Sequence, residues 1–255
     1  MPPSPITVAV DGPSGSGKSS VSRAVARELD LAYLDTGAMY RALTWACLDA
    51  GTDLSDASAV AELARTLPLE IATDPQAPAV SVGGTDVTEA IRESRISEQV
   101  SAVATNLDVR AELRRRQREI IEEQRAAHGG VVAEGRDITT VVAPDAEHRL
   151  LLTASEQARL ARRSLELHGT AAAEAVASTR DQIVRRDRDD STVSAFLEAA
   201  DGVVTVDTSD LTFDEVVSTV LALVRGEVGT RPAPVPVGTP ADDPVPPTAD
   251  PEELS

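Results

Sequence analysis

Eight residues near the start of the chain have the types and spacing of a site that holds a phosphate chain. They are Gly12, Pro13, Ser14, Gly15, Ser16, Gly17, Lys18 and Ser19, and Ser20 follows directly. Glycines at these positions let the backbone curl so that successive N–H groups face a phosphate, and the lysine adds a charge for the terminal oxygens. The Ser19 hydroxyl can bind Mg²⁺. The spacing therefore predicts a P-loop that binds a nucleoside triphosphate, with a chance Gly/Ser-rich turn as the weaker alternative.

The surroundings of this loop are those that the motif requires. Residues 6–10 read Ile-Thr-Val-Ala-Val, a β-branched run typical of a buried parallel strand, and a helical pattern follows from about 20 to 29. That helix would aim its positive end at the bound anion. GTPases, motor ATPases and small-molecule kinases all share such a loop, so a second site must decide the reaction.

A second polar segment, residues 35–41, follows the end of another strand-like run and opens a helix. In parallel α/β sheets, ligands bind beyond the carboxyl ends of the strands. Thr36 and Arg41 are therefore expected to face the same crevice as the P-loop, and Asp35 could hold Mg²⁺ through water. The alternative is that Asp35 or Thr36 is only a helix N-cap.

Further arginines can reach this crevice. Arg136 and Asp137 follow a strand and a glycine. Arg159, Arg162 and Arg163 are spaced i, i+3 and i+4, so they share one helix face and can converge. The basic run Arg114, Arg115, Arg116 and Arg118 predicts a solvated helix face.

Strands alternate with helices along the chain, which predicts an α/β fold with a parallel sheet covered on both faces. Further helices are expected at about 38–50, 60–67, 96–103, 107–128, 155–168, 171–188 and 212–228, and further strands at 31–34, 131–133, 149–152 and 203–206. Between them, short strand-like pieces at 69–73, 79–82 and 85–87 are separated by tight turns. They predict a small antiparallel insert at about 69–90.

The overall composition excludes several classes of protein. The chain has 255 residues, a formal net charge of -18 and only 2% aromatic residues, so its core must be built from Val, Leu, Ile and Ala. Such an acid excess argues against nucleic-acid binding, which needs clustered Lys and Arg. No apolar run has the length of a membrane span or the pattern of a signal peptide. We expect a monomeric cytoplasmic protein without nucleic-acid or membrane partners.

The end of the chain has a different character. From residue 229 onward the sequence is acidic, rich in proline and without apolar periodicity. Such sequences do not bury enough surface to offset their ordering entropy. We therefore expect one domain over residues 1–228 and a disordered tail over residues 229–255.

Taken together, these motifs resemble the bacterial cytidylate kinases, members of the nucleoside monophosphate kinase group. The resemblance spans about residues 6–228. It is carried by the P-loop and by the segments 34–41, 86–92, 109–118, 134–137 and 186–191, which read LDTGAMYR, DVTEAIR, VRAELRRRQR, EGRD and RDRDDS. The insert after residue 69 is similar to the extra subdomain of that family.

The resemblance implies that the γ-phosphate of ATP is transferred to CMP or dCMP, with Mg²⁺ as cofactor. It implies that the acceptor phosphate is bound by Arg41, Arg110 and Arg136. It implies that cytosine or the sugar is recognised by Thr36, Ser101, Asp137, Arg186 and Asp190. Catalytic roles are implied for Lys18, Arg159, Arg163 and Arg186, with the helix of Arg159 and Arg163 forming part of a lid at about 155–190.

Two positions depart from the family pattern, which usually has Arg in place of Val193 and favours Gly in place of Thr139. Two other functions therefore stay open. One is a P-loop kinase for another small acceptor. The other is a nucleotide-binding regulator without turnover, suggested by Val193. ADP production measured against a panel of monophosphates and other alcohols distinguishes the three.

Deletion of residues 229–255 is expected to leave phosphotransfer activity and Tm almost unchanged, because this segment lacks the apolar residues that docking would require. Enzyme assays and thermal unfolding of the truncated and full chains test this. A large loss in either quantity would show that the tail docks on the domain.

Overall fold

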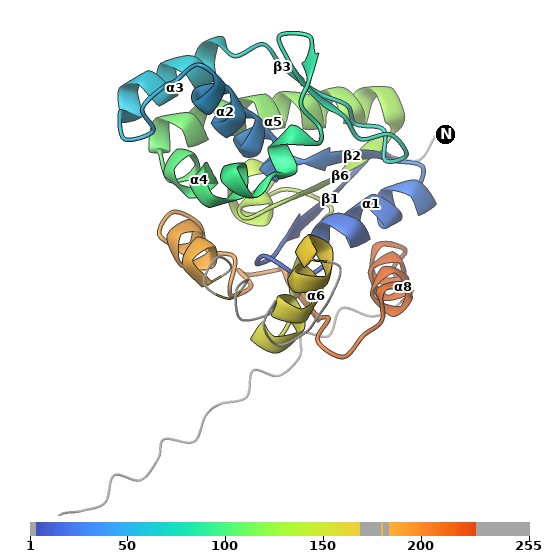
Figure 1. Ribbon diagram of the computed structural model, residues 1–255. Helices are drawn as coiled ribbons and strands as arrows, with labels where there is room; N and C mark the ends of the chain where they lie inside the picture. Colours follow the sequence, from blue (N-terminus) through green and yellow to red (C-terminus); the bar gives the residue numbers. More distant parts are fainter. Residues whose placement is uncertain (1–3, 169–179, 181–183, 228–255) are drawn as a thin grey trace, which may run out of the picture.

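The computed structural model describes residues 4–168, 180 and 184–227. Its centre is a five-stranded sheet with strand order β2-β6-β1-β7-β8 (Figure 1). All four pairings of this sheet are parallel. The strands are β1 (Ile6–Asp11), β2 (Ala32–Asp35), β6 (Gly130–Gly135), β7 (His148–Thr153) and β8 (Val204–Asp207). The predicted α/β class with a parallel sheet is confirmed.

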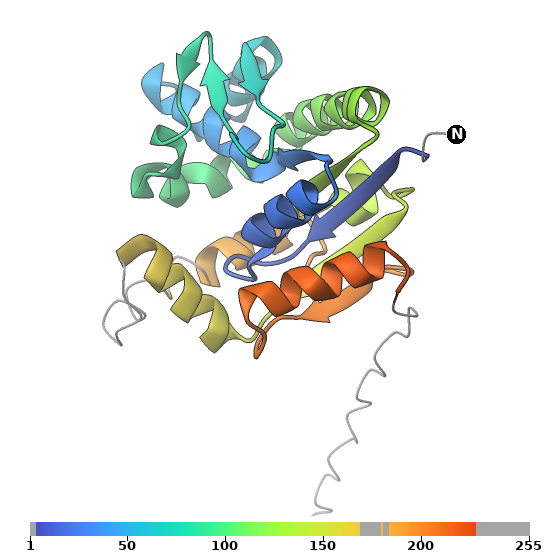
Figure 2. The same ribbon diagram turned by 90° about the vertical axis from the view of Figure 1, so that its right-hand side faces the viewer.

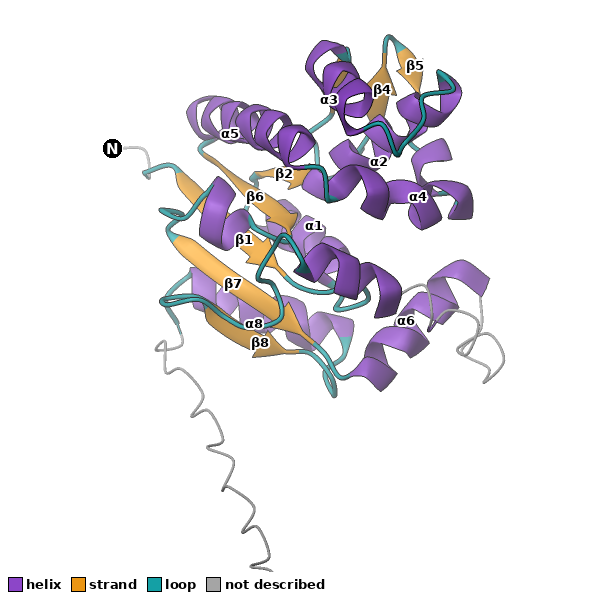
Figure 3. Cartoon of the chain, turned by 90° about the vertical axis from the view of Figure 1, so that its left-hand side faces the viewer, coloured by secondary structure: helices purple, strands orange, loops and turns teal. Residues whose placement is uncertain are grey.

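Helices cover both faces of the sheet, because the strands are apolar on both sides. On one face α1 (Lys18–Glu28) and α8 (Phe213–Val224) lie side by side (Figure 2). On the other face lie α2 (Thr36–Asp49) and α5 (Leu107–His128), visible in the opposite view (Figure 3). The helices α3 (Ala57–Thr66) and α4 (Ser94–Ala104) pack outside these two.

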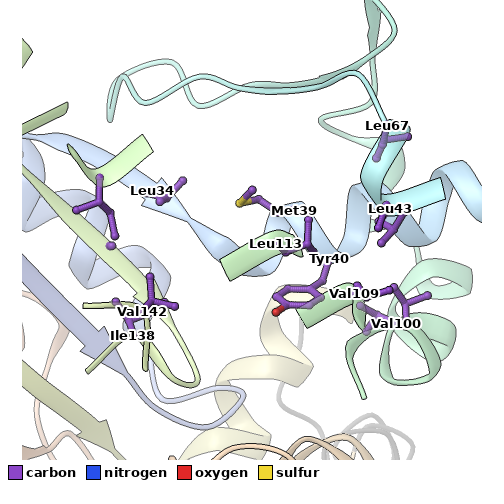
Figure 4. Close-up of a cluster of buried hydrophobic side chains, with 14 of the residues drawn as sticks. Leu34, Met39, Tyr40, Leu43, Leu67, Val100, Val109, Leu113, Ile138 and Val142 are labelled. Atoms are coloured by element: carbon purple, nitrogen blue, oxygen red, sulfur yellow. The ribbon is translucent and has the colours of Figure 1, made fainter. Parts of the chain in front are cut away.

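Side chains of successive strand residues pack into two separate hydrophobic cores, one on each face of the sheet. In β1, Val8 and Val10 belong to the cluster under α1 and α8, whereas Ala9 belongs to the cluster under α2 and α5. This alternation follows from the two-residue period of a strand. The second cluster also contains Leu34 and Leu113, which Figure 4 shows among other buried side chains of the cluster. Burial of these aliphatic groups is the main stabilising term of the fold.

The predicted insert is a separate antiparallel sheet of β3 (Leu69–Ile71), β4 (Val80–Val82) and β5 (Thr85–Asp86). It is followed by the short 3₁₀ helix η1 (Ala90–Arg92). Val80, Val87 and Ile91 pack on Ala38 and Ala42 of α2. The small alanines allow close approach, so the insert is packed directly on the helix that carries Arg41.

Of the two helices predicted at 155–168 and 171–188, the structure describes the first and only part of the second. The helix α6 (Glu156–His168) confirms the prediction at 155–168. The predicted helix at 171–188 falls mostly outside the described residues, although residues 184–191 are helical. The tail at 229–255 lies outside the described residues as well. Among the helices that are described, none combines the length and apolar character needed to cross a membrane.

The predicted solvated face of α5 is wrong for two of its four arginines, Arg114 and Arg116, which are half-buried. Arg114 forms an ion pair with Asp137. Arg116 donates to carbonyl oxygens at the end of α3, and Arg118 donates to those at the end of η2 (Ile138–Val142), a π-helical turn after β6. Arg115 and Arg118 are exposed, as predicted, and Arg115 pairs with glutamates of its own helix. Arginine can satisfy several carbonyls at once, which is why a helix end attracts it.

A buried carboxylate connects the end of β1 to the π-helical turn. Asp11 accepts hydrogen bonds from the backbone N–H groups of Ile138 at 2.9 Å and Thr139 at 2.8 Å. The Thr139 hydroxyl donates a third, at 2.6 Å. Burial raises the pKa of Asp11, and these bonds oppose that effect. Thr139, a departure from the family pattern, therefore acts next to the P-loop as a support for Asp11.

Thr139→Val keeps the side-chain shape and removes the hydroxyl donor. We expect the free energy of unfolding to fall by about 1.5–3 kcal/mol, the usual contribution of a hydrogen bond to a charged group. Urea and thermal unfolding measure this loss. The matched control is Thr140→Val, because the Thr140 hydroxyl makes no hydrogen bond with the described part of the chain and its loss should be nearly neutral. Equal stability of the natural chain and Thr139→Val would contradict the assigned role.

Candidate active site

A cavity of about 690 Å³ lies at the carboxyl edge of the parallel sheet. Its walls come from the P-loop, the start of α2, α4, α5, the end of β6, α6 and the helical residues 184–191. The strands are parallel, so β1, β2 and β6 all deliver the residues that follow them to this one edge. The predicted crevice is thus present.

The P-loop has the backbone geometry that its glycines predict. Gly15 has φ +77°, and a Cβ there would lie 2.6 Å from the carbonyl oxygen of Arg159. Any side chain would therefore collide with α6, which packs directly against the loop. Gly17, at the N-cap of α1, has φ +87° and offers no side chain to the first N–H groups of the helix. Those donors remain available to an anion.

Lys18 is buried beside the carboxylate of Glu134, with Nζ 3.9 Å from Oε2. Burial and the nearby Arg136 lower the pKa of Lys18 to about 8, and Glu134 only partly offsets them. The lysine is therefore short of negative partners. A phosphate group placed beside it would restore the balance.

Glu134 is a site residue that sequence reasoning did not identify. Its Oε1 accepts hydrogen bonds from the hydroxyls of Ser19 at 2.6 Å and Tyr33 at 3.2 Å. Its side chain is only 2% exposed, and burial together with Asp35 raises its pKa. The available signal was its position at the end of a strand, the same position that singled out Asp35.

The structure confirms that Asp35 is the N-cap of α2, the alternative interpretation of its sequence position. One oxygen caps α2 by accepting from the N–H of Ala38 at 2.9 Å. The other accepts from Arg41 at 2.8 Å. Burial alone would raise the pKa of Asp35, but the charge of Arg41, the N–H of Ala38 and other nearby cations together outweigh it, so the pKa lies below its usual value. Asp35 is therefore a charged residue at the cavity wall that also fixes the position of Arg41.

Asp137 is held by two arginines of α5. Its Oδ2 accepts from Arg110 at 2.7 Å and from Arg114 at 2.6 Å. Arg110 also donates to the Ser194 hydroxyl at 2.5 Å, and the Tyr40 ring lies 6.0 Å from its guanidinium carbon. Within the described chain, Oδ1 of Asp137 accepts no hydrogen bond, so it is left to meet a ligand in the cavity.

Arg136 and Arg186 share one carboxylate, Asp190, at 3.4 and 3.8 Å. Arg136 also donates to the carbonyl oxygen of Gly12 at 2.8 Å, which ties it to the P-loop. Burial and the charge of Arg136 lower the pKa of Arg186 to about 10. Two cations against one anion leave this part of the cavity with unbalanced positive charge.

Side chains of α6 and of the 184–191 helix contact the backbone of the P-loop. Arg159 donates to the carbonyl oxygen of Ser14 at 3.0 Å and forms an ion pair with Asp187. Asp187 accepts in turn from the N–H of Ser14 at 3.1 Å. Arg162 donates to Thr208, at the end of β8. Of the three arginines on this helix face, Arg162 and Arg163 line the cavity.

Most of the residues singled out from the sequence lie around this one cavity. It is lined by Ser14, Gly15, Ser16, Gly17, Lys18, Ser19, Ser20, Asp35, Thr36, Arg41, Arg110, Arg136, Asp137, Arg163, Arg186 and Asp190. Gly12, Pro13, Ser101 and Arg159 are absent from the lining. On α4 the wall is formed instead by Ser97, Val100 and Ala104. Helical phase alone does not fix which turn of α4 faces the cavity.

Comparison with known proteins agrees with this geometry. The sequence profile of the cytidylate kinase family matches residues 8–226. The cytidylate kinase of Streptomyces avermitilis is 47% identical over 86% of this chain and 93% of its own length. That of Cutibacterium acnes is 47% identical over 88% and 98%, and that of Rhodococcus jostii 44% over 90% and 99%. The chain therefore belongs to the cytidylate kinase family of ATP-dependent phosphotransferases.

Proposed function

We propose that this chain transfers the γ-phosphate of ATP to CMP or dCMP, giving ADP and CDP or dCDP. The observation that carries the proposal is the single cavity that joins the P-loop lysine to three arginines, Arg41, Arg110 and Arg136. Donor and acceptor phosphates placed there would meet within one cavity. Such positioning supplies much of the rate enhancement of phosphoryl transfer.

The donor phosphates fit the P-loop. The free N–H groups at the start of α1 and the charge of Lys18 can bind the β and γ oxygens. The Ser19 hydroxyl and the buried Glu134 carboxylate, 2.6 Å apart, form an oxygen-rich pair suited to hold Mg²⁺. Asp35 would complete that site through water. The ion would neutralise charge on the transferred phosphate.

The acceptor fits the opposite wall. Arg41, Arg110 and Arg136 each present planar N–H donors that match phosphate oxygens. The open Oδ1 of Asp137 can accept from the cytosine amino group or a sugar hydroxyl. Thr36, Arg186 and Asp190 line the same space and are proposed to recognise the base or the sugar. Ser101 would have to approach through a shift of α4.

The chemistry needs no covalent intermediate. Charge spreads over the equatorial oxygens of the transferred group, and fixed cations stabilise it. Lys18, Arg163 and Arg186 line the cavity and are placed for this role. Arg159 is proposed to act from the lid, although here it is held by Ser14 and Asp187.

We further propose the division of the chain that its sequence suggests. Residues 1–228 form one kinase domain, with the insert at about 69–90 on the acceptor side and the lid at about 155–190 on the donor side. Residues 229–255 form a separate tail. The insert is packed on α2, the helix of Arg41, which supports its assignment to the acceptor side. The proposed working state is a cytoplasmic monomer.

The proposed acceptor class is tested by ADP production with CMP, dCMP, UMP, AMP and GMP. CMP and dCMP are expected to exceed AMP and GMP by about a hundredfold or more in kcat/KM, because purines leave the fixed polar groups of the wall unpaired. A preference for AMP would contradict the proposal. ATP binding without CMP-dependent ADP release would indicate the regulator, and turnover only with a non-nucleotide alcohol would indicate another kinase.

The lowered pKa of Lys18 predicts a pH dependence of ATP binding. The lysine is charged below its pKa of about 8 and loses its proton above it, while bound phosphates favour the charged form. ATP affinity is therefore expected to be constant at neutral pH and to weaken by up to about tenfold per pH unit above 8. Calorimetric titrations from pH 6.5 to 9.5 measure this.

Two variants provide the controls for this titration. Lys18→Arg keeps its charge at every pH tested, so it should lose the pH dependence. Lys18→Ala should nearly abolish transfer while leaving the Tm close to that of the natural chain. Near-normal turnover of Lys18→Ala would contradict the P-loop assignment.

A further inference from the structure

Phe196 is buried in an unusual environment. Its side chain is fully inaccessible, and it is among the largest completely buried residues. Yet it belongs to none of the three hydrophobic clusters described above. Phe196 is therefore buried apart from the three clusters that fill the cores.

The group next to Phe196 is Arg136. The guanidinium carbon of Arg136 lies 5.0 Å from the centroid of the Phe196 ring, within the range of a cation–π contact. Arg136 lines the cavity and Phe196 does not, so the ring lies behind the guanidinium as seen from the ligand space. The ring thus packs against the guanidinium of Arg136 without occupying any of the space for the ligand.

The remaining contacts of Arg136 restrain its edges. Nη1 donates to the Gly12 carbonyl oxygen at 2.8 Å, and Nε lies 3.4 Å from Asp190 without forming a hydrogen bond. With the described residues, Nη2 forms no hydrogen bond. One edge is therefore fixed to the P-loop, one face rests on Phe196, and Nη2 remains available to an acceptor oxygen.

An aromatic ring is chemically suited to this support. A second carboxylate behind Arg136 would neutralise the charge that an anionic ligand needs, and an aliphatic side chain would offer only contact. The ring face carries partial negative charge and attracts the cation while leaving its donors free. It also excludes water from that side, which strengthens the interaction of Arg136 with a phosphate.

We propose that Phe196 is a positioning residue for the acceptor, holding the guanidinium of Arg136 in the orientation that binds the phosphate of the nucleoside monophosphate. This assignment rests on the proposed function. It makes the segment after the 184–191 helix a part of acceptor recognition, although its aromatic side chain never touches the ligand.

The test uses Phe196→Leu, which keeps an apolar side chain and removes the ring. The expected result is a rise of about tenfold in KM for CMP, from the loss of a desolvated cation–π contact, with KM for ATP within about twofold and the Tm lowered only modestly. Phe196→Tyr keeps an aromatic ring, so its KM for CMP should stay close to that of the natural chain. Phe196→Met, of similar volume, gives a second ring-free variant should Phe196→Leu fold poorly. The control is Leu197→Ala, because Leu197 is 52% exposed and outside the cavity lining.

A double-mutant cycle separates positioning from general structure. Arg136→Met should raise KM for CMP, and adding Phe196→Leu should then raise it little further, because the ring acts through Arg136. Additive losses, equal rises in both KM values, or an unchanged KM for CMP in Phe196→Leu would each overturn the assignment of Phe196. Absence of CMP turnover in the natural chain would overturn the proposed function instead, and this assignment with it.

Discussion

The site depends on one electrostatic constraint, the crowding of several cations into a single partly buried cavity. Like charges so close together would repel strongly in a medium of low dielectric constant, so each needs a carboxylate. The pairs are Lys18 with Glu134, Arg41 with Asp35, Arg110 with Asp137, and Arg136 and Arg186 with Asp190. Burial and the neighbouring charge of Arg136 lower the pKa of Lys18 to about 8 and that of Arg186 to about 10, so the carboxylates do not fully offset the crowding of cations. Anionic ligands bound in the cavity would neutralise the remaining positive charge.

This local balance explains how a chain with a net charge of -18 can hold anions. At physiological salt, charges more than about 8 Å from a ligand are largely screened when they face water. The acidic surface therefore contributes little inside the cavity, where buried arginines and backbone N–H groups act at short range. The same surface gives no attraction at long distance, so capture of a nucleotide must depend on the geometry of the cavity rather than on steering.

Much of the fold could be predicted from the sequence, because β-branched runs, glycine stops and the capping box at Thr212 act locally. The rule that ligands bind beyond the carboxyl ends of parallel strands also placed Thr36, Arg41 and Arg136 at one edge of the sheet. The contacts within the site could not be predicted, because which carboxylate meets which cation depends on distances set by the whole fold. Glu134 and Asp35 occupy equivalent strand ends, yet Glu134 is the one that contacts Ser19. Sequence patterns carry no information about that choice.

Because aromatic residues are scarce in this chain, the positions of the few that it has are informative about their roles. The chain has one Trp, two Tyr and two Phe, and its cores are filled mainly by aliphatic side chains, with Tyr40 in one cluster and Tyr33 in the other. Tyr33 donates to Glu134, Tyr40 lies beside Arg110, and Phe196 lies beside Arg136. Aliphatic groups can fill a core, but they can neither donate a hydrogen bond to a carboxylate nor attract a guanidinium with a ring face. These aromatic side chains thus contact the charged groups of the site, where their electrostatic properties matter more than their volume.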